Sequence, residues 1–316
     1  MKILISGAAG YQGTKIIPIL LKLNHRIIAI DTMWFGNRLK KHKNLKIIKK
    51  NIIDVESNDL KKVDIVLHLA SIANDPMGDL KQHLTWEYSC IATMKLAELC
   101  IKNKVKKLIY ASSASVYGVK REKKVTEQLS LEPISTYNKA KMIAERVLLS
   151  YKKHMNISII RPATVCGVSP RMRFDVSVNM LTYQAIKNKK ITVFGGSQIR
   201  PNIHIDDLLR LYIKFFSNDK KYNGIFNAGF ENLSINKIAK LVQLQVPCKI
   251  VKIKNSKDIR SYRVNSDKLL KLGFRPKKTV EQAIKEVKKE FKDKINNLDK
   301  RFFSIDWLKK KFSDEK

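Results

Sequence analysis

The sequence has little of several features that define special classes of protein. Its 316 residues include only 12 glycines and 8 prolines, which excludes a collagen-like or linker-like chain. Hydrophobic residues make up 44% of the chain, a larger share than an intrinsically disordered protein contains. At roughly 150 residues per domain, the length predicts either two domains or one large α/β unit with a smaller appendage.

Cysteines are few, and long apolar runs are absent. Cys90, Cys100, Cys166 and Cys248 form no CxxC pair and have no histidine at metal-ligand spacing, so we expect no metal site, no disulfides and a reducing compartment. No apolar run approaches the ~20 residues that cross a bilayer. Met1 leads straight into strand-like residues rather than a signal peptide. The sequence therefore predicts a cytoplasmic protein without membrane insertion.

Acidic residues are scarce, because 28 Asp and Glu stand against 63 Lys and Arg and give a formal net charge of +35. Such an excess suits a nucleic-acid partner, an anionic membrane surface or an anionic small substrate. The lysines, however, are spread along nearly the whole chain, as a general compositional bias would place them. Charge alone therefore does not decide the function.

What is present is an alternation of short β-branched runs with longer helical patterns. Continuous Ile, Val and Leu runs are typical of strands covered on both faces, and their alternation with helices predicts right-handed βαβ crossovers. The fold class expected is α/β with a doubly wound parallel sheet. Strands are predicted at residues 2–7, 26–31, 45–54, 63–70, 106–113 and 157–163, with helices at 14–23, 84–103 and 136–153.

The alternation weakens after about Val165, where loops rich in Arg, Asn and Gly begin. We therefore predict a first domain over residues 1–165 and a smaller substrate-binding region over 166–316, with strands and helices that return to the first domain. From Thr279 a Lys/Glu-rich amphipathic helix is expected, followed by a tail that holds Phe302, Phe303 and Trp307.

A glycine-rich stretch lies where the first predicted strand turns into the first helix. It reads Gly7-Ala8-Ala9-Gly10-Tyr11-Gln12-Gly13. Glycines there allow a sharp turn and let backbone N–H groups approach a pyrophosphate at the positive end of the helix. Many strand-to-helix turns carry one or two glycines, but three at this place predict a dinucleotide site.

An acidic residue, Asp31, ends the second predicted strand at the distance expected for a carboxylate that binds the adenosine ribose. It favours NAD over NADP, because the 2′-phosphate of NADP would meet a like charge. The alternative is that Asp31 is an ordinary loop aspartate without a role in cofactor binding. The basic residues from Arg38 to Lys50, with no acid between Asp31 and Asp54, keep some NADP use open.

The spacing Tyr-x-x-x-Lys places a phenol and an ammonium on one helix face, where the ammonium stabilises phenolate. It occurs three times, at Tyr11–Lys15, Tyr137–Lys141 and Tyr183–Lys187, so position must choose among the copies. Tyr137 opens the helix that follows the strand ending at Ala111-Ser112-Ser113. The carboxyl edge of such a sheet is where ligands bind, so this copy is the catalytic candidate.

Taken together, these residues resemble the extended short-chain dehydrogenase/reductase family, and in particular its branch of NAD-dependent nucleotide-sugar epimerases and dehydratases. The resemblance covers nearly the whole chain and implies an NAD-binding Rossmann domain over 1–165 and a region over 166–316 that mainly binds the nucleotide sugar. Besides Tyr137 and Lys141, the residues implied to contact NAD are Gly7, Gly10, Tyr11, Gln12, Gly13, Asp31, Asp54, Val55, Leu69, Ala70 and Ser71.

The resemblance also implies the catalytic residues Ser113, Tyr137 and Lys141, a homodimer through helices 84–103 and 136–153, and a role in making a cell-surface polysaccharide. Two positions depart from the family pattern, because Ser89 replaces an asparagine and Gln12 replaces an apolar residue. The paired donors of an arginine suit phosphate oxygens, although each arginine could instead be a solvated loop cation. The substrate contacts expected are Ser113, Ser115, Arg171, Arg173, Asn179, Arg200 and Arg260.

The expected reaction begins with oxidation of the sugar. An ordinary tyrosine has a pKa near 10, and the Lys141 ammonium together with the nicotinamide charge is expected to lower it. Tyr137 would then remove the proton of the C4 hydroxyl while hydride passes to NAD⁺, with Ser113 bonded to the same oxygen and Lys141 to the nicotinamide ribose.

Several outcomes remain open after this step. A 4,6-dehydratase needs an acid and a base directly after the active-site hydroxyl, where this chain has Ala114 and Ser115, so dehydration is disfavoured. A 4-epimerase is predicted, with a 4-dehydrogenase or 4-ketoreductase as the alternative. A dehydrogenase-like RNA-binding protein would not need Ser113, Tyr137 and Lys141 together, so a nucleic-acid partner is disfavoured.

Overall fold

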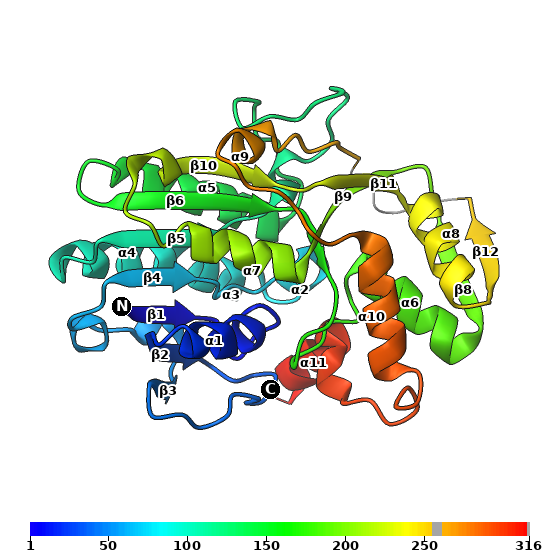
Figure 1. Cartoon of the computed structure of the whole chain (residues 1–316), viewed down its shortest axis with the longest axis horizontal. Helices are drawn as coiled ribbons and strands as arrows, with labels where there is room; N and C mark the ends of the chain where they lie inside the picture. The colour runs from blue at the N-terminus through cyan, green and yellow to red at the C-terminus, as the bar shows by residue number, and fades with distance from the viewer. Residues whose placement is uncertain (255–260, 315–316) are drawn as a thin grey trace.

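A parallel sheet of seven strands forms the centre of the molecule in the computed structural model, which describes residues 1–254 and 261–314 (Figure 1). The strand order is β10-β6-β5-β4-β1-β2-β3, and every neighbouring pair is parallel. The expected doubly wound α/β fold is confirmed. The strands are β1 (Lys2–Ser6), β2 (Arg26–Asp31), β3 (Leu45–Lys49), β4 (Ile65–His68), β5 (Lys107–Ala111), β6 (Asn156–Pro162) and β10 (Gly224–Ala228).

Helices cover both faces of this sheet because its strands are apolar on both sides. In β1, Ile3 and Ile5 pack into one core and Leu4 into the other. The helices α1 (Gly13–Lys22) and α7 (Ile205–Lys214) close the first core, whereas α4 (Ala92–Lys102) and α5 (Thr136–Ser150) close the second. The carboxyl edge of the sheet is thereby left for the loops that carry the candidate site.

A smaller region, to the right in Figure 1, contains a sheet of order β11-β9-β7 and a pair β12-β8. After residue 165 the chain also returns to the central sheet through α7 and β10. The elements of the smaller region are β7 (Thr164–Cys166), α6 (Ser177–Asn188), β8 (Lys190–Phe194), β9 (Ile199–His204), β11 (Glu231–Ser234), α8 (Ile235–Gln245), β12 (Lys249–Ile253) and α10 (Val280–Phe291).

The C-terminal tail packs against the loop that follows β2. Leu308 and Phe312 of α11 (Ser304–Ser313) share an apolar cluster with Trp34, and the Trp307 indole donates to the Trp34 carbonyl oxygen at 2.7 Å. The remaining short helices are α2 (Asp75–Gly78), α3 (Gln82–Trp86) and α9 (Asp267–Lys271). No helix among the described residues has both the length and the apolar character that a membrane span requires.

A buried ion pair ties α5 to the sheet. The Glu145 carboxylate accepts from Arg161 of β6, with Nε–Oε1 at 2.9 Å and Nη2–Oε2 at 2.6 Å, and both side chains are almost fully buried. The same carboxylate accepts from the Ser112 hydroxyl at 2.5 Å, and Arg161 donates to the Tyr117 hydroxyl at 2.6 Å. Every polar group of this pair therefore has a partner that replaces water.

Replacing Glu145 by alanine should lower the free energy of unfolding by about 3–5 kcal/mol, because the Arg161 guanidinium would remain buried without its counter-charge. Urea denaturation followed by circular dichroism would measure the change. The exposed pair Glu281–Lys285 provides the control, since E281A should leave the denaturation midpoint unchanged. A midpoint for E145A equal to that of E281A would contradict the expectation.

Candidate functional site

The glycine-rich turn between β1 and α1 is packed so closely that side chains do not fit at two of its positions. Gly7 has a φ of +70°, and a Cβ there would lie 2.7 Å from the Ala70 nitrogen. A Cβ on Gly13 would overlap the carbonyl oxygen of Ala8. These glycines let α1 begin directly beneath the turn, so that its amino end faces the carboxyl edge of the sheet.

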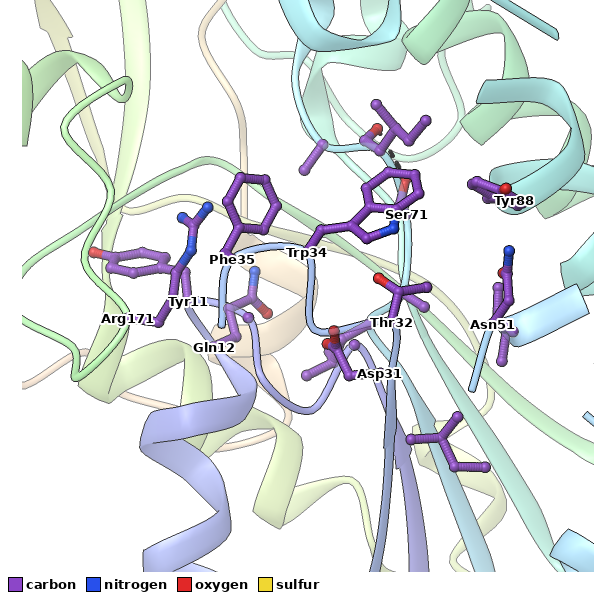
Figure 2. A pocket seen from close by; sticks show the side chains of 18 of the residues that line it. Tyr11, Gln12, Asp31, Thr32, Trp34, Phe35, Asn51, Ser71, Tyr88 and Arg171 are labelled. Carbon is purple, nitrogen blue, oxygen red and sulfur yellow. Dashed lines mark hydrogen bonds between the residues drawn. The ribbon is translucent and has the colours of Figure 1, made fainter. Parts of the chain in front are cut away.

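A first pocket opens above this turn. Asp31 lies in it at the end of β2, where its carboxylate accepts from the backbone N–H groups of Ala9 at 3.0 Å and Met33 at 2.6 Å (Figure 2). Burial raises the pKa of Asp31, while these hydrogen bonds oppose the rise. The predicted cofactor residues that line the pocket are Gly7, Gly10, Tyr11, Gln12, Asp31, Leu69, Ala70 and Ser71.

Aromatic side chains that the sequence analysis did not single out complete this pocket. Figure 2 shows Trp34 and Phe35 within it, and Leu308 of α11 also lines it. Phe35 stacks against the Arg171 guanidinium, whose carbon lies 4.0 Å from the ring centroid. The available signal was the apolar run Met33-Trp34-Phe35, which begins two residues after Asp31 and lies beyond the end of the predicted strand.

The three predicted catalytic residues lie together in a second pocket, beside the first. Ser113 follows β5, whereas Tyr137 and Lys141 lie on one face of α5, and all three line this cavity. The Ser113 side chain acts on Tyr137 by lowering the pKa of the phenol. Residues that line both pockets, and so connect them, are Tyr11, Gln12, Leu69, Ser71, Ala73 and Arg173.

In the protein by itself, without the nicotinamide charge expected to act together with Lys141, the pKa of Tyr137 is raised. Burial raises the pKa of Tyr137 to about 12, the charge of Asp75 adds to the rise, and the charge of Arg173 opposes it. The Lys141 ammonium lies 6.0 Å from the centroid of the Tyr137 ring and donates instead to the Ala111 carbonyl oxygen at 2.7 Å. Desolvation therefore outweighs the ammonium charge.

Burial acts on Lys141 in the opposite direction, because it disfavours the charged form of each group. It lowers the pKa of Lys141 to about 7, against the attraction of the Glu145 carboxylate one turn further along α5. Burial thus favours the neutral form of the Tyr137 phenol and leaves the Lys141 amine about half protonated near pH 7. An added positive charge in the neighbouring pocket would favour the phenolate.

Three of the four predicted phosphate-binding arginines lie among the described residues, and these three do not form one cluster. Arg200 lines the second pocket, whereas Arg171 lines the first and donates to the Ser304 hydroxyl at 2.8 Å. Arg173 lies where the two pockets meet and is paired with Asp175. Arg260 lies outside the described residues. Of the three described arginines, Arg200 is the one that lines the second pocket alone.

Several predicted contacts do not line either pocket. Asn179 is fully buried beneath them and has its amide occupied: its oxygen accepts from the Gly167 N–H, and its nitrogen donates to the Tyr11 hydroxyl and the Arg173 carbonyl. Asp54 is exposed and Val55 is buried, while Lys50, Asn51 and Ile52 line the first pocket in their place. Gly13, Asp54, Val55 and Asn179 thus line neither pocket, and their contacts with a ligand stay predictions.

Ser115 and Ser89 both take part in hydroxyl pairs. Ser115 lines the second pocket and lies 2.7 Å from Ser113 between their oxygens. Ser89, in a π-helical turn at Glu87–Ile91, has its hydroxyl 2.8 Å from that of Ser71. The serine that replaces the family asparagine therefore still reaches a residue that lines both pockets.

The second pocket is also lined by residues that the sequence analysis did not single out. Asp75 and Asp175 contribute carboxylates, and Phe194 and Tyr262 contribute rings. They come from four separate loops or strand ends, so no local spacing connects them in the sequence. Only the folded chain brings them to one cavity.

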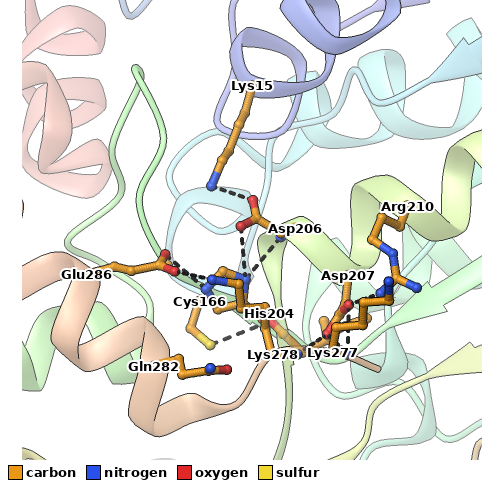
Figure 3. A network of polar contacts seen from close by, with 12 residues as sticks. Lys15, Cys166, His204, Asp206, Asp207, Arg210, Lys277, Lys278, Gln282 and Glu286 are labelled. Carbon is orange, nitrogen blue, oxygen red and sulfur yellow. Dashed lines mark hydrogen bonds and ion pairs between the residues drawn. The ribbon is translucent and has the colours of Figure 1, made fainter. Parts of the chain in front are cut away.

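A polar network joins α1, α7 and α10 on another part of the molecule (Figure 3). The His204 ring lies 3.1 Å from Glu286 through Nε2 and accepts from the Asp206 N–H at 3.1 Å through Nδ1. These three side chains are close enough for a metal ion, but Lys15 pairs with Asp206 at 2.6 Å and Lys278 with Glu286 at 2.9 Å. The lysines already supply the balancing charge, so the cluster ties the three helices together.

Comparison with known proteins agrees with this geometry. Residues 3–229 match the NAD dependent epimerase/dehydratase family. The chain is 32% identical over 261 residues to an uncharacterised UDP-glucose epimerase of Bacillus subtilis (strain 168), covering 77% of this chain and 81% of that protein. It is 27% identical over 273 residues to a UDP-glucose 4-epimerase of Lactobacillus helveticus, covering 77% and 82% of the two proteins.

Among solved structures, a UDP-glucuronic acid 4-epimerase of Bacillus cereus, in complex with UDP-glucuronic acid and NAD, has a TM-score of 0.83 and 28% identity. The similarity covers 95% of this chain and 100% of that one. The tight glycine turn, the Asp31 pocket and the matched family residues together fit NAD as the cofactor. The chain is an enzyme of the NAD-dependent epimerase/dehydratase family, within the extended short-chain dehydrogenases/reductases.

Proposed function

We propose that this enzyme is an NAD-dependent nucleotide-sugar 4-epimerase that oxidises its substrate transiently at C4. The observation that carries the proposal is the meeting of Ser113, Tyr137 and Lys141 in a pocket that shares a wall with the pocket above the glycine turn. This arrangement suits a reaction in which a sugar hydroxyl loses its proton to a side chain while the carbon that bears it loses hydride to the cofactor.

In this proposal each residue has a distinct role. Tyr137 takes the proton of the C4 hydroxyl, Ser113 bonds to the same oxygen, and Lys141 adds positive charge beside the phenol and contacts the nicotinamide ribose. Bound NAD⁺ supplies the acceptor for the C4 hydrogen and returns it. We propose Gly7, Gly10, Tyr11, Gln12, Asp31, Leu69, Ala70 and Ser71 as the residues that hold it.

Epimerisation fits this pocket better than dehydration. The position after Ser113 is Ala114, which is buried and has no ionisable group, and the next is Ser115, whose hydroxyl donates to Asn138. Neither supplies the acid–base pair that expels the C6 oxygen. Net oxidation or reduction at C4 uses the same three residues, so a 4-dehydrogenase or 4-ketoreductase is the second candidate.

Two side chains that line the second pocket suit a nucleoside diphosphate. Arg200 offers a guanidinium for phosphate oxygens, and the half-exposed Phe194 offers a ring face against which a base can stack. The similar Bacillus cereus enzyme binds a nucleotide sugar. We place the reaction in the cytoplasm, where it would supply a sugar for a cell-surface polysaccharide.

Incubating the protein and NAD⁺ with a panel of UDP-, dTDP-, GDP- and CDP-sugars should convert one of them into an isomer of unchanged mass. Mass spectrometry and chromatographic separation of the stereoisomers would measure this. A product lighter by two hydrogens, with NADH accumulating, would replace the epimerase by the dehydrogenase. Loss of water would contradict the interpretation of Ala114 and Ser115.

Replacing Tyr137 by phenylalanine should reduce turnover at least about 100-fold, because it removes the proton acceptor while keeping the ring. Binding of NAD⁺, measured by calorimetry, should change little. Tyr183→Phe is the matched control, since Tyr183 has the same spacing to Lys187 but does not line the second pocket. Equal activities of the two variants would remove Tyr137 from the mechanism.

We also propose that two copies of the chain associate through α4 and α5. The two helices pack beside each other on one face of the sheet, and three large apolar side chains on and next to them remain exposed: Ile91 at 49%, Met94 at 38% and Ile143 at 38%. A second copy that places the same helices against them would cover this surface symmetrically.

Replacing Ile143 by glutamate should convert the dimer into a monomer, because the charge would be buried without a partner at the interface. Light scattering coupled to size-exclusion chromatography would give the mass. Leu244, which is 80% exposed on α8, supplies the matched apolar control. The proposed interface is wrong if wild-type protein is monomeric, or if I143E and L244E have the same mass.

A further inference from the structure

The C-terminal tail, defined as residues 299–314, reaches the first pocket although it is far in the sequence from the other residues there. Leu308 of α11 is 1% exposed and lines that pocket, whereas the rest of the lining comes from residues 7–173. The tail thus supplies part of the wall of the proposed cofactor site.

Two contacts join the tail to the β2–β3 loop, residues 32–44. The Trp307 indole donates to the Trp34 carbonyl oxygen at 2.7 Å. The Asp299 carboxylate forms an ion pair with Arg38 further along the same loop. The tail therefore holds the β2–β3 loop at two separate points.

The β2–β3 loop carries the aromatic part of the first pocket, because Trp34 and Phe35 both line it (Figure 2). All residues of this loop are described, and none belongs to a helix or a strand. A segment without regular structure is held mainly by its contacts with other parts of the protein. The place of these two rings therefore depends on the tail.

The tail also contacts the loop between β7 and α6, residues 167–176. The fully buried Ser304 hydroxyl accepts from Nη2 of Arg171 at 2.8 Å and donates to Oδ1 of Asp175 at 3.0 Å. Arg171 lines the first pocket and Asp175 the second. One hydroxyl of the tail thus connects the walls of both pockets.

The two loops are joined to each other where they meet the tail. The Arg171 guanidinium that donates to Ser304 also stacks on the Phe35 ring, with its carbon 4.0 Å from the ring centroid (Figure 2). Phe35, Arg171 and Ser304 therefore form one continuous contact from the β2–β3 loop to the tail. A displacement of the tail would release both loops at once.

Helix α11 needs this packing as much as the loops do. It has only ten residues, and an isolated helix of that length is marginal in water. Leu308 and Phe312 place it in an apolar cluster with Trp34 and Phe35. The order of the tail and the order of the pocket wall therefore support each other.

We propose that the C-terminal tail is a clamp that holds the β2–β3 loop over the cofactor and so slows its release. In this proposal Leu308 contacts the cofactor, and Trp307 is a positioning residue that acts through Trp34. The inference rests on the proposed assignment of the first pocket to NAD.

Slow release suits a 4-epimerase better than a 4-dehydrogenase. An epimerase returns hydride to the sugar that supplied it, so early loss of the cofactor would end its reaction at the ketone. A dehydrogenase, in contrast, exchanges its cofactor in every catalytic cycle. The clamp therefore deepens the proposed function by explaining how the cofactor stays in place through both halves of the reaction.

The first experiment measures how fast NADH leaves the full-length protein. Protein loaded with NADH is mixed with a large excess of NAD⁺ and no sugar, and the loss of bound-NADH fluorescence gives the dissociation rate. Trp307→Phe removes the donor to Trp34 but keeps a ring, and Leu308→Ala removes a side chain of the pocket. Leu269→Ala on α9 is the matched control, because Leu269 is fully buried but lines neither pocket.

We expect W307F to release NADH about 5-fold faster, the effect of one lost hydrogen bond, and L308A about 10-fold faster, the effect of lost apolar contact. L269A should keep the wild-type rate. Trp307 does not line the pocket, so its variant tests the clamp separately from direct contact and decides the matter if L308A does not fold. An unchanged rate in W307F, or a rate in L269A equal to that in L308A, would overturn the proposal.

The second experiment tests the same coupling from the other side. Coupling between two sites is reciprocal, so bound cofactor must stabilise the tail as much as the ordered tail strengthens cofactor binding. Adding NAD⁺ should therefore slow amide hydrogen exchange in residues 304–313 by about 5- to 10-fold. Helix α9 is the internal control and should exchange at the same rate with and without NAD⁺. Equal exchange of the tail in both conditions would contradict the clamp.

Neither measurement uses a sugar, which separates this proposal from the proposed function. Faster NADH release from W307F in a protein that isomerises no nucleotide sugar would disprove the epimerase and support the clamp. Isomerisation together with wild-type NADH release from W307F would support the epimerase and disprove the clamp.

Discussion

The carboxylate of Glu145 is the constraint on which the geometry of the site depends. It binds Arg161 on β6 and Ser112 at the end of β5, and it lies on α5 two turns after Tyr137. Because side chains four residues apart stack on one helix face, fixing Glu145 against the sheet also fixes Lys141 and Tyr137. Ser112 precedes Ser113, so the same carboxylate places the hydroxyl that meets the phenol.

The burial of these residues changes the pKa values of Tyr137 and Lys141. The surroundings that hold Tyr137 and Lys141 exclude water, and they raise the pKa of the phenol to about 12 and lower that of the amine to about 7. Near neutral pH the phenol is therefore neutral and the amine about half protonated, so Tyr137 by itself is a weak base. A site of this kind becomes a base only when its ligands contribute positive charge, which couples proton transfer to cofactor binding.

The sequence predicted the features that local chemistry determines. Gly7 and Gly13 follow from a turn that admits no side chain. The copy of Tyr-x-x-x-Lys that lines the second pocket follows from its place after a strand that ends at the ligand edge. A parallel sheet covered by helices on both faces follows from the continuous apolar strands.

What depends on distant contacts was not predictable in the same way. Asn179 has the right residue type for a phosphate contact, but its amide is used between Gly167, Tyr11 and Arg173 beneath the pocket. Asp75 belongs to a four-residue helix with no periodicity, and its contact with Asn138 forms only in the folded chain. The net charge of +35 is similarly uninformative, because the deeply buried Glu145, Asp175 and Asp207 are each paired with an arginine. Three of the scarce acids thus pair with arginines inside the fold, whereas most of the described lysines are at least partly exposed.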